Sequence, residues 1–172
     1  QTTQERTASP PAPTPPQKAK DILRNGLKEK LARGEVAASM AVRLVRSPEI
    51  AQVASSCGFD SFYVEMQHSS FTVAEISAIC QAALLVGITP LVRVPTIGSE
   101  YVGRILDGGA LGVIAPEINS AEEVRQLVAN AKFPPLGDRS APGGQLFQLR
   151  YRSFPAAETY DALNDATMVV VM

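Results

Sequence analysis

Residues 62–94 read FYVEMQHSSFTVAEISAICQAALLVGITPLVRV and contain two strand-like runs separated by a helix-like one. The runs FYVEM (62–66) and TPLVRV (89–94) are short, apolar and of strand length. The intervening TVAEISAICQAALLVG (72–87) ends in a glycine, as helices commonly do. Parallel neighbouring strands need a crossover, which is normally helical. The stretch therefore predicts a β-α-β unit with two parallel strands.

The same alternation extends over most of the chain, which predicts an α/β fold with five strands. A helix is expected from the spacing of Ile22, Leu23, Leu27 and Leu31, and another from Ser47-Pro48-Glu49 to Gly58. Ser120 and Glu123 form a capping box at the start of a further helix. The other predicted elements are strands at 39–45 (SMAVRLV), 111–116 (LGVIAP) and 168–172 (MVVVM), and helices at 98–109 (GSEYVGRILDGG) and 156–166 (AAETYDALNDA).

Two arrangements of such a sheet are open, a doubly wound sheet and a β/α barrel. No glycine-rich phosphate loop follows the first strand, where VRSPE (45–49) stands, which weakens a dinucleotide-binding reading. The run MVVVM is typical of a strand buried on both faces, and no helix follows to cover it. A β/α barrel has eight strands in roughly 250 residues, so a barrel would be present only as its first five strands. A flavodoxin-like binding domain that is complete at five strands is the alternative.

The composition is that of one soluble domain: 172 residues, 45% hydrophobic and 19% charged. Residues 1–18 are rich in Pro and Thr and poor in large apolar residues, so they are predicted to form a disordered tail before a partial barrel at 19–172. The net charge of −1 argues against nucleic acid or an anionic membrane as a partner and favours small molecules. Cys57 and Cys80 form no CxxC motif, which suits a reducing, cytoplasmic location.

Polar residues follow the predicted strands at the ends where parallel α/β folds bind ligands. Glu65, Gln67 and His68, the one histidine of the chain, end the second strand. Arg93 ends the third strand, and Asp107 closes the next helix. Burying an arginine is costly unless it meets an anion, so Arg93 indicates either a carboxylate ligand or a structural salt bridge. His68 alone could be an ordinary loop residue, but together with Arg93 it favours an active site.

Four motifs, in this order, resemble the HpcH/HpaI aldolase/citrate lyase family, the class II 2-keto-acid aldolases of the phosphoenolpyruvate/pyruvate barrel superfamily. The motifs are FDSFYVEMQHSSFT (59–72), PLVRVP (90–95), RILDGGALGVIAPEINSAEEV (104–124) and KFPPLGDRSAPG (132–143). The resemblance implies a (β/α)8 TIM barrel and a metal-dependent carbon–carbon lyase that forms or cleaves 4-hydroxy-2-keto acids through a pyruvate enolate. The implied partners are a keto acid and an aldehyde, and the full-length protein is expected to be a homo-oligomer.

The resemblance also implies roles for individual residues. His68 matches the catalytic acid/base, Asp107 the acid that orients it in a dyad, and Arg93 the arginine that steadies the keto acid. Glu65 and Gln67 are expected to bind substrate, although relatives often carry Asp and Glu there. Arg139 lies in a loop that covers the active site in the family, and ordinary turn chemistry is the alternative explanation for it.

The implied cofactor is a divalent metal, Mg, Mn or Co. The family's metal carboxylates end the fifth and sixth strands, which places them beyond Met172, so no metal ligand is predicted within the chain. The 172 residues by themselves are therefore expected to be inactive. A non-catalytic α/β domain that binds a keto acid is the remaining alternative.

Overall fold

The computed structural model describes residues 17–144 and 146–172. Most of the predicted tail therefore lies outside the described residues, and the tail remains a prediction. The strands are β1 (Ser39–Val42), β2 (Ser61–Glu65), β3 (Thr89–Arg93), β4 (Gly112–Ala115) and β5 (Met168–Val171). The helices are α1 (Ala19–Ile22), α2 (Gly26–Ala32), α3 (Ile50–Ser56), α4 (Val73–Val86), α5 (Ser99–Asp107), α6 (Ala121–Ala131) and α7 (Ala156–Ala166), with a 3-10 turn at Phe147–Leu149.

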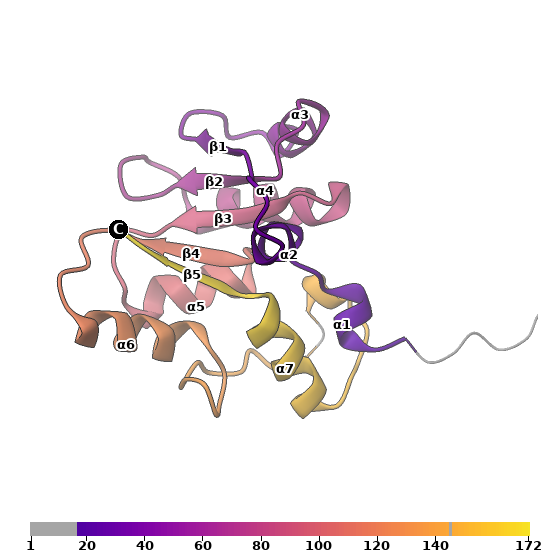
Figure 1. Cartoon of the computed structure of the whole chain (residues 1–172), viewed down its shortest axis with the longest axis vertical. Helices are drawn as coiled ribbons and strands as arrows, with labels where there is room; N and C mark the ends of the chain where they lie inside the picture. The colour runs from indigo at the N-terminus through magenta and orange to yellow at the C-terminus, as the bar shows by residue number, and fades with distance from the viewer. Residues whose placement is uncertain (1–16, 145) are drawn as a thin grey trace, which may run out of the picture.

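The five strands form one parallel sheet in the order β1-β2-β3-β4-β5 (Figure 1). Strand order distinguishes the two arrangements left open above, because a flavodoxin-like sheet has the order 2-1-3-4-5. Strands that follow one another in sequence order, each reached through a helix, have the connectivity of a β/α barrel. The barrel-type prediction is confirmed, and the doubly wound alternative is wrong.

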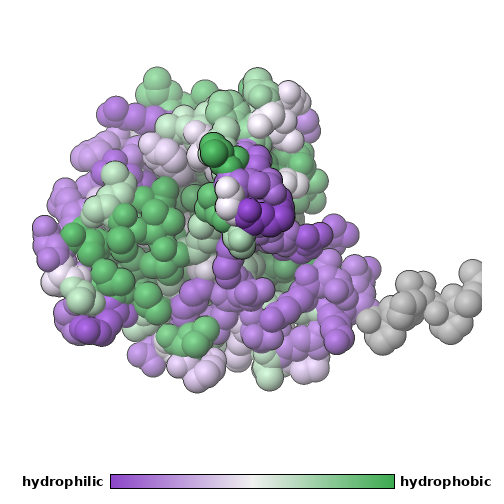
Figure 2. All heavy atoms as spheres, in the orientation of Figure 1, coloured by the Kyte–Doolittle hydropathy of each residue, from purple (hydrophilic) through white to green (hydrophobic). Residues whose placement is uncertain are grey.

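The two faces of the sheet are covered differently. On one face, Phe62, Val64, Val92 and Val113 pack in a large core with the apolar sides of α3 to α6. On the other face, Leu91 and Ile114 form a smaller cluster with Leu27 of α2. Figure 2 shows apolar side chains gathered beside α2 on this second face. Since successive strand residues point to opposite faces, Glu65 and Arg93, which follow Val64 and Val92, point to the face that carries α2.

Helix α2 covers the amino ends of the strands and leaves their carboxyl ends open. The backbone amide of Leu27 donates to the Thr89 hydroxyl at the first residue of β3 (3.1 Å). The Asn25 side chain caps α2 by accepting from the Lys28 amide, and it also donates to the carbonyls of Leu111 and Ala166. The first turn of the fold is therefore anchored at the end of the sheet away from His68.

The capping box predicted at Ser120 and the helix end predicted at Gly87 are both confirmed. Thr72 and Glu75 form a reciprocal capping box at the start of α4, as Ser120 and Glu123 do for α6. Gly87 ends α4 in the left-handed conformation, with φ of 78°, which costs little without a Cβ. Helix α7 has the predicted bounds.

Three predicted elements differ in extent. The helix expected across residues 22–31 is two helices, because the chain turns at Asn25 to reach Leu111 and Ala166. The first strand ends at Val42 rather than residue 45, and α3 begins at Ile50 rather than beside Ser47. Strand β5 is only partly buried, whereas its sequence predicted burial on both faces. No helix within residues 17–144 and 146–172 is long and apolar enough to cross a membrane.

Candidate active site

An acid–arginine pair joins the carboxyl ends of β2 and β3. Glu65 and Arg93 are register partners at the last positions of their strands. Arg93 Nη1 donates to Glu65 Oε2 at 3.0 Å, and the Glu65 side chain is only 7% exposed. Arg93 therefore meets an anion, as its place in an apolar strand required, and that anion belongs to the protein. Nevertheless, Arg93 Nε is buried and has no partner in the described part of the chain.

The second oxygen of Glu65 holds the loop that carries the histidine. Glu65 Oε1 accepts from the backbone amides of Gln67 (2.8 Å) and His68 (3.1 Å). Burial alone would raise the pKa of Glu65, but the amide of His68 and the Arg93 guanidinium outweigh it and lower that pKa. Glu65 is thus ionised near neutrality, and its charge fixes the start of the loop.

His68 lies at the mouth formed by the strand ends, with its backbone bound on both sides. Its amide donates to Glu65, and its carbonyl accepts from Arg43 Nε at 3.1 Å. The imidazole itself makes no hydrogen bond or ion pair within the described residues, and His68 is exposed. A ring on an anchored backbone, with both nitrogens available, can exchange a proton with a bound molecule.

Gln67 connects this group to the end of β4. Its Nε2 donates to Glu117 Oε1 at 3.2 Å, while its Oε1 is buried without a partner among the described residues. Glu117 follows β4 and has a φ of 58°, an uncommon conformation for a residue with a side chain. Buried polar atoms without partners usually mark water or a ligand. Gln67 Oε1 and Arg93 Nε are two such atoms at the strand ends.

Sequence reasoning did not select Glu117 as a site residue. It stands directly after the LGVIAP strand, so the rule that selected Gln67 and His68 after β2 would also have selected it. The structure thus brings Glu65, Gln67, His68 and Arg93 together with Glu117 at one edge of the sheet.

The structure places Asp107 away from this mouth. Asp107 is the last residue of α5, which runs back from the carboxyl end of β3 toward the start of β4 (Figure 1). Its carboxylate accepts from Arg139 Nη2 at 2.5 Å. The predicted dyad between Asp107 and His68 does not form within this chain, because a helix length separates the ends on which they stand. Its catalytic role remains a prediction from the resemblance.

Arg139 is packed under the helices rather than lying over the strand ends. Its side chain is 3% exposed, with its guanidinium carbon 4.5 Å from the centre of the Phe133 ring. Burial lowers the pKa of Arg139, and Asp107 opposes that shift. The expectation that Arg139 belongs to a loop above the active site is not what this structure shows. The loop turns inward because the amides of Asp138 and Arg139 bond to the Ala129 and Lys132 carbonyls.

A resident metal ion would need a group of side chains that could hold it. In residues 17–144 and 146–172, no three His, Cys, Asp or Glu side chains cluster closely enough to hold a metal ion. The Glu65 carboxylate already accepts hydrogen bonds from Arg93 and from two backbone amides. The described residues therefore do not by themselves fit a resident metal ion. Cys57 and Cys80 are free thiols, and burial raises the pKa of Cys80 to about 12.

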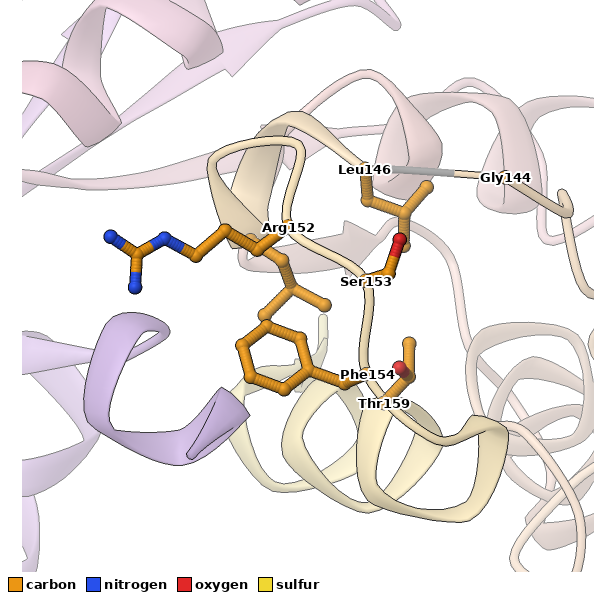
Figure 3. A pocket seen from close by; sticks show the side chains of 7 residues that line it. Gly144, Leu146, Arg152, Ser153, Phe154 and Thr159 are labelled. Atoms are coloured by element: carbon orange, nitrogen blue, oxygen red, sulfur yellow. The ribbon is translucent and has the colours of Figure 1, made fainter. Parts of the chain in front are cut away.

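A separate cavity of about 500 Å³ lies far from this chemistry (Figure 3). It is formed where the segment before α7 folds over that helix, and Leu146, Phe154 and Thr159 line it. The Arg152 side chain points away from the other labelled side chains, and its Nη1 donates to Gln17. This cavity contains no member of the residue group at the strand ends. Acid, arginine and histidine meet at the strand ends instead.

Curated relatives of this chain are aldolases. The 4-hydroxy-4-methyl-2-oxoglutarate aldolases of Chaetomium globosum and Hapsidospora irregularis are 43% and 42% identical to it over 122 residues. Each match covers 70% of this chain and 45% of the relative. The 2-keto-3-deoxy-L-rhamnonate aldolase of Escherichia coli K12 is 29% identical over 69% of this chain and 44% of its own length. The chain thus spans less than half the length of these relatives.

Solved structures share the fold. An HpcH/HpaI aldolase from Desulfitobacterium hafniense superimposes with a TM-score of 0.80 at 32% identity, over 87% of this chain and 56% of its own. Macrophomate synthase gives a TM-score of 0.68 at 23% identity, over 87% of this chain and 52% of its own, which supports the fold alone. The sequence model of HpcH/HpaI aldolase/citrate lyase matches residues 39–172. The chain therefore belongs to the HpcH/HpaI aldolase/citrate lyase family.

Proposed function

We propose that the full-length protein is a class II aldolase that forms or cleaves 4-hydroxy-2-keto acids through a pyruvate enolate. The observation that supports this most directly is the group at the strand ends, where Arg93 and His68 are both held by Glu65. An arginine beside a proton-transfer residue suits the chemistry of a keto acid, which needs an anion site and a base. Membership of the family supports aldol chemistry as the reaction class.

In the cleavage direction, Arg93 binds the carboxylate and keto oxygens of the substrate. His68 takes the proton of the hydroxyl on C4, and that carbon becomes a carbonyl as the bond between C3 and C4 breaks. The bonding electrons pass to C3 and form the enolate of pyruvate, whose negative charge faces the Arg93 guanidinium. Protonation of C3 then gives pyruvate, and the other product leaves with its new carbonyl. Addition is the same sequence in reverse.

A divalent metal ion, Mg, Mn or Co, belongs to the same proposal. Such an ion would stabilise the enolate as a Lewis acid. The family pattern puts its carboxylate ligands after the position of Met172, so this chain contributes binding and proton transfer. A cytoplasmic location and assembly into a homo-oligomer are also part of the proposal.

The proposal is tested with the full-length protein and 4-hydroxy-4-methyl-2-oxoglutarate, the substrate named for two of the relatives. Pyruvate release is expected with Mg²⁺, Mn²⁺ or Co²⁺, and EDTA should abolish it until metal is restored. Inactivation by borohydride in the presence of pyruvate, or full activity in EDTA, would contradict the mechanism.

A further inference from the structure

Arg43 extends the charged row at the strand ends by one strand. Val42, the last residue of β1, is the register partner of Val64, so Arg43 stands beside Glu65. Val42 and Val64 both pack in the core under the helices, and therefore Arg43 points to the same face as Glu65 and Arg93. The carboxyl ends of three adjacent strands thus present Arg43, Glu65 and Arg93 side by side.

This row has more positive charge than it can neutralise internally. The Glu65 carboxylate accepts from Arg93 and from two loop amides, and no hydrogen bond or ion pair joins it to Arg43. Arg43 is exposed and uses only Nε, in its bond to the His68 carbonyl. Its two terminal nitrogens make no hydrogen bond or ion pair among the described residues. Those nitrogens have the fork geometry that binds a carboxylate.

The nearby Arg46 shows what a structural arginine looks like in this region. Arg46 bonds to both oxygens of Glu75 and to Ser70, and its guanidinium lies over the Phe71 ring. Its charge is neutralised within the protein and helps to fix the loop before α4. Arg43 has no such acid among residues 17–144 and 146–172, although it lies only three positions before Arg46. The difference indicates that the partner of Arg43 comes from outside the chain.

We propose that Arg43 binds a carboxylate on the acceptor half of the substrate, so that the acceptor itself carries a carboxylate rather than being an uncharged aldehyde. This inference rests on the aldolase function proposed above. Arg43 contacts the backbone of His68, the residue proposed to act on the C4 hydroxyl, and C4 belongs to the acceptor half. Strands β1 and β3 are two strand spacings apart, roughly 9–10 Å. A keto acid with a carboxylate at each end can therefore extend from Arg93 to Arg43.

The test compares two substrates of the full-length protein. One is 4-hydroxy-4-methyl-2-oxoglutarate, which carries the acceptor carboxylate, and the other is 4-hydroxy-2-oxopentanoate, which lacks it. Arg43→Gln should lower kcat/KM for the dicarboxylate by about 10- to 100-fold, mainly through KM, because one charge-assisted carboxylate contact is lost. The monocarboxylate should change by less than about 3-fold. Arg46→Gln, the matched control, should not discriminate between the substrates.

An equal loss with both substrates would overturn the inference, because Arg43 would then act only by positioning the His68 loop. An unchanged KM for the dicarboxylate would also overturn it. A second measurement does not depend on turnover: calorimetric binding of 2-oxoglutarate and of 2-oxopentanoate to the wild type and Arg43→Gln. One outcome is that the wild type binds the dicarboxylate more tightly, with that preference lost in Arg43→Gln, while the full-length protein cleaves neither hydroxy acid. That result would support the binding site and contradict the aldolase proposal. Cleavage of the hydroxy acids without a binding preference for the dicarboxylate would support the aldolase proposal and contradict the Arg43 site.

Discussion

Glu65–Arg93 and Asp107–Arg139, the two acid–arginine pairs whose arginine is largely buried, differ in what surrounds them. Glu65 and Arg93 end two neighbouring strands, with Arg93 Nε and Gln67 Oε1 buried and unpartnered in the described chain. Asp107 and Arg139 join the end of α5 to the loop after α6, where Arg139 packs on Phe133. The same residue types thus serve an open edge in one place and packing between helices in the other.

The comparison shows that the place in the fold decides what such a pair can do. At the carboxyl ends of parallel strands, side chains meet beyond the last backbone pairing, at the edge where such folds bind ligands. A free donor does not distinguish the two pairs, because Arg139 Nε is also buried without a partner in the described chain. Between a helix end and a loop, Arg139 is covered by Phe133, and Asp107 neutralises its charge. The first pair is therefore suited to binding, and the second to holding α5 against the loop at residues 137–140.

The largest effect is expected from His68→Ala in the full-length protein. Loss of a general acid/base typically lowers kcat by about 10²- to 10⁴-fold, and the affinity for pyruvate should change little because Arg93 remains. Steady-state kinetics across pH would measure this, with the exposed Arg104→Gln as a control. A variant with near-normal turnover and an unchanged pH profile would show that His68 is only a loop residue.

A smaller effect on a different property is expected from Arg139→Met. The methionine keeps contact with Phe133 but leaves Asp107, which is about one third exposed, without its partner. We expect a loss of about 2–3 kcal/mol in the free energy of unfolding, below the range for fully buried pairs because water screens Asp107. Chemical denaturation would measure it. A raised KM for the keto acid with unchanged stability would instead support the substrate-binding role that the resemblance implied for Arg139.

How far the sequence predicted these features depended on the range of the interaction involved. The capping box at Ser120 was predicted because it depends on residues three positions apart. The one at Thr72 has the same spacing but was not selected. The break at Asn25 was not predicted, since its side chain bonds to Leu111 and Ala166, far along the chain.

The candidate site shows the same limit. Strand ends alone predicted that Glu65, Gln67, His68 and Arg93 would meet, because parallel strands end at one edge. The attachment of Asp107 to Arg139 depends on how α5 packs against a loop some 30 residues later, which no local pattern encodes. Arg43 was hidden because the predicted first strand ran on to residue 45, past the position where β1 ends.

The smallest expected effect concerns the pH dependence of stability contributed by Glu65. Its pKa is lowered in the folded protein, so the ionised carboxylate stabilises the fold above the unfolded value of 4.5. That contribution is lost as pH falls through the lower, folded pKa. At pH 7, Glu65→Gln should cost about 1–2 kcal/mol in the free energy of unfolding, since an amide accepts more weakly from Arg93 and the loop amides. Denaturant titrations from pH 7 to pH 3 should show the difference from wild type shrinking below pH 4.5.

Glu122→Gln, at an exposed pair with Arg125, should change stability by less than about 0.5 kcal/mol at any of these pH values. A Glu65→Gln difference that stayed constant down to pH 3 would mean that the carboxylate charge does not hold the His68 loop, and the distinction between the two pairs would then rest on exposure alone.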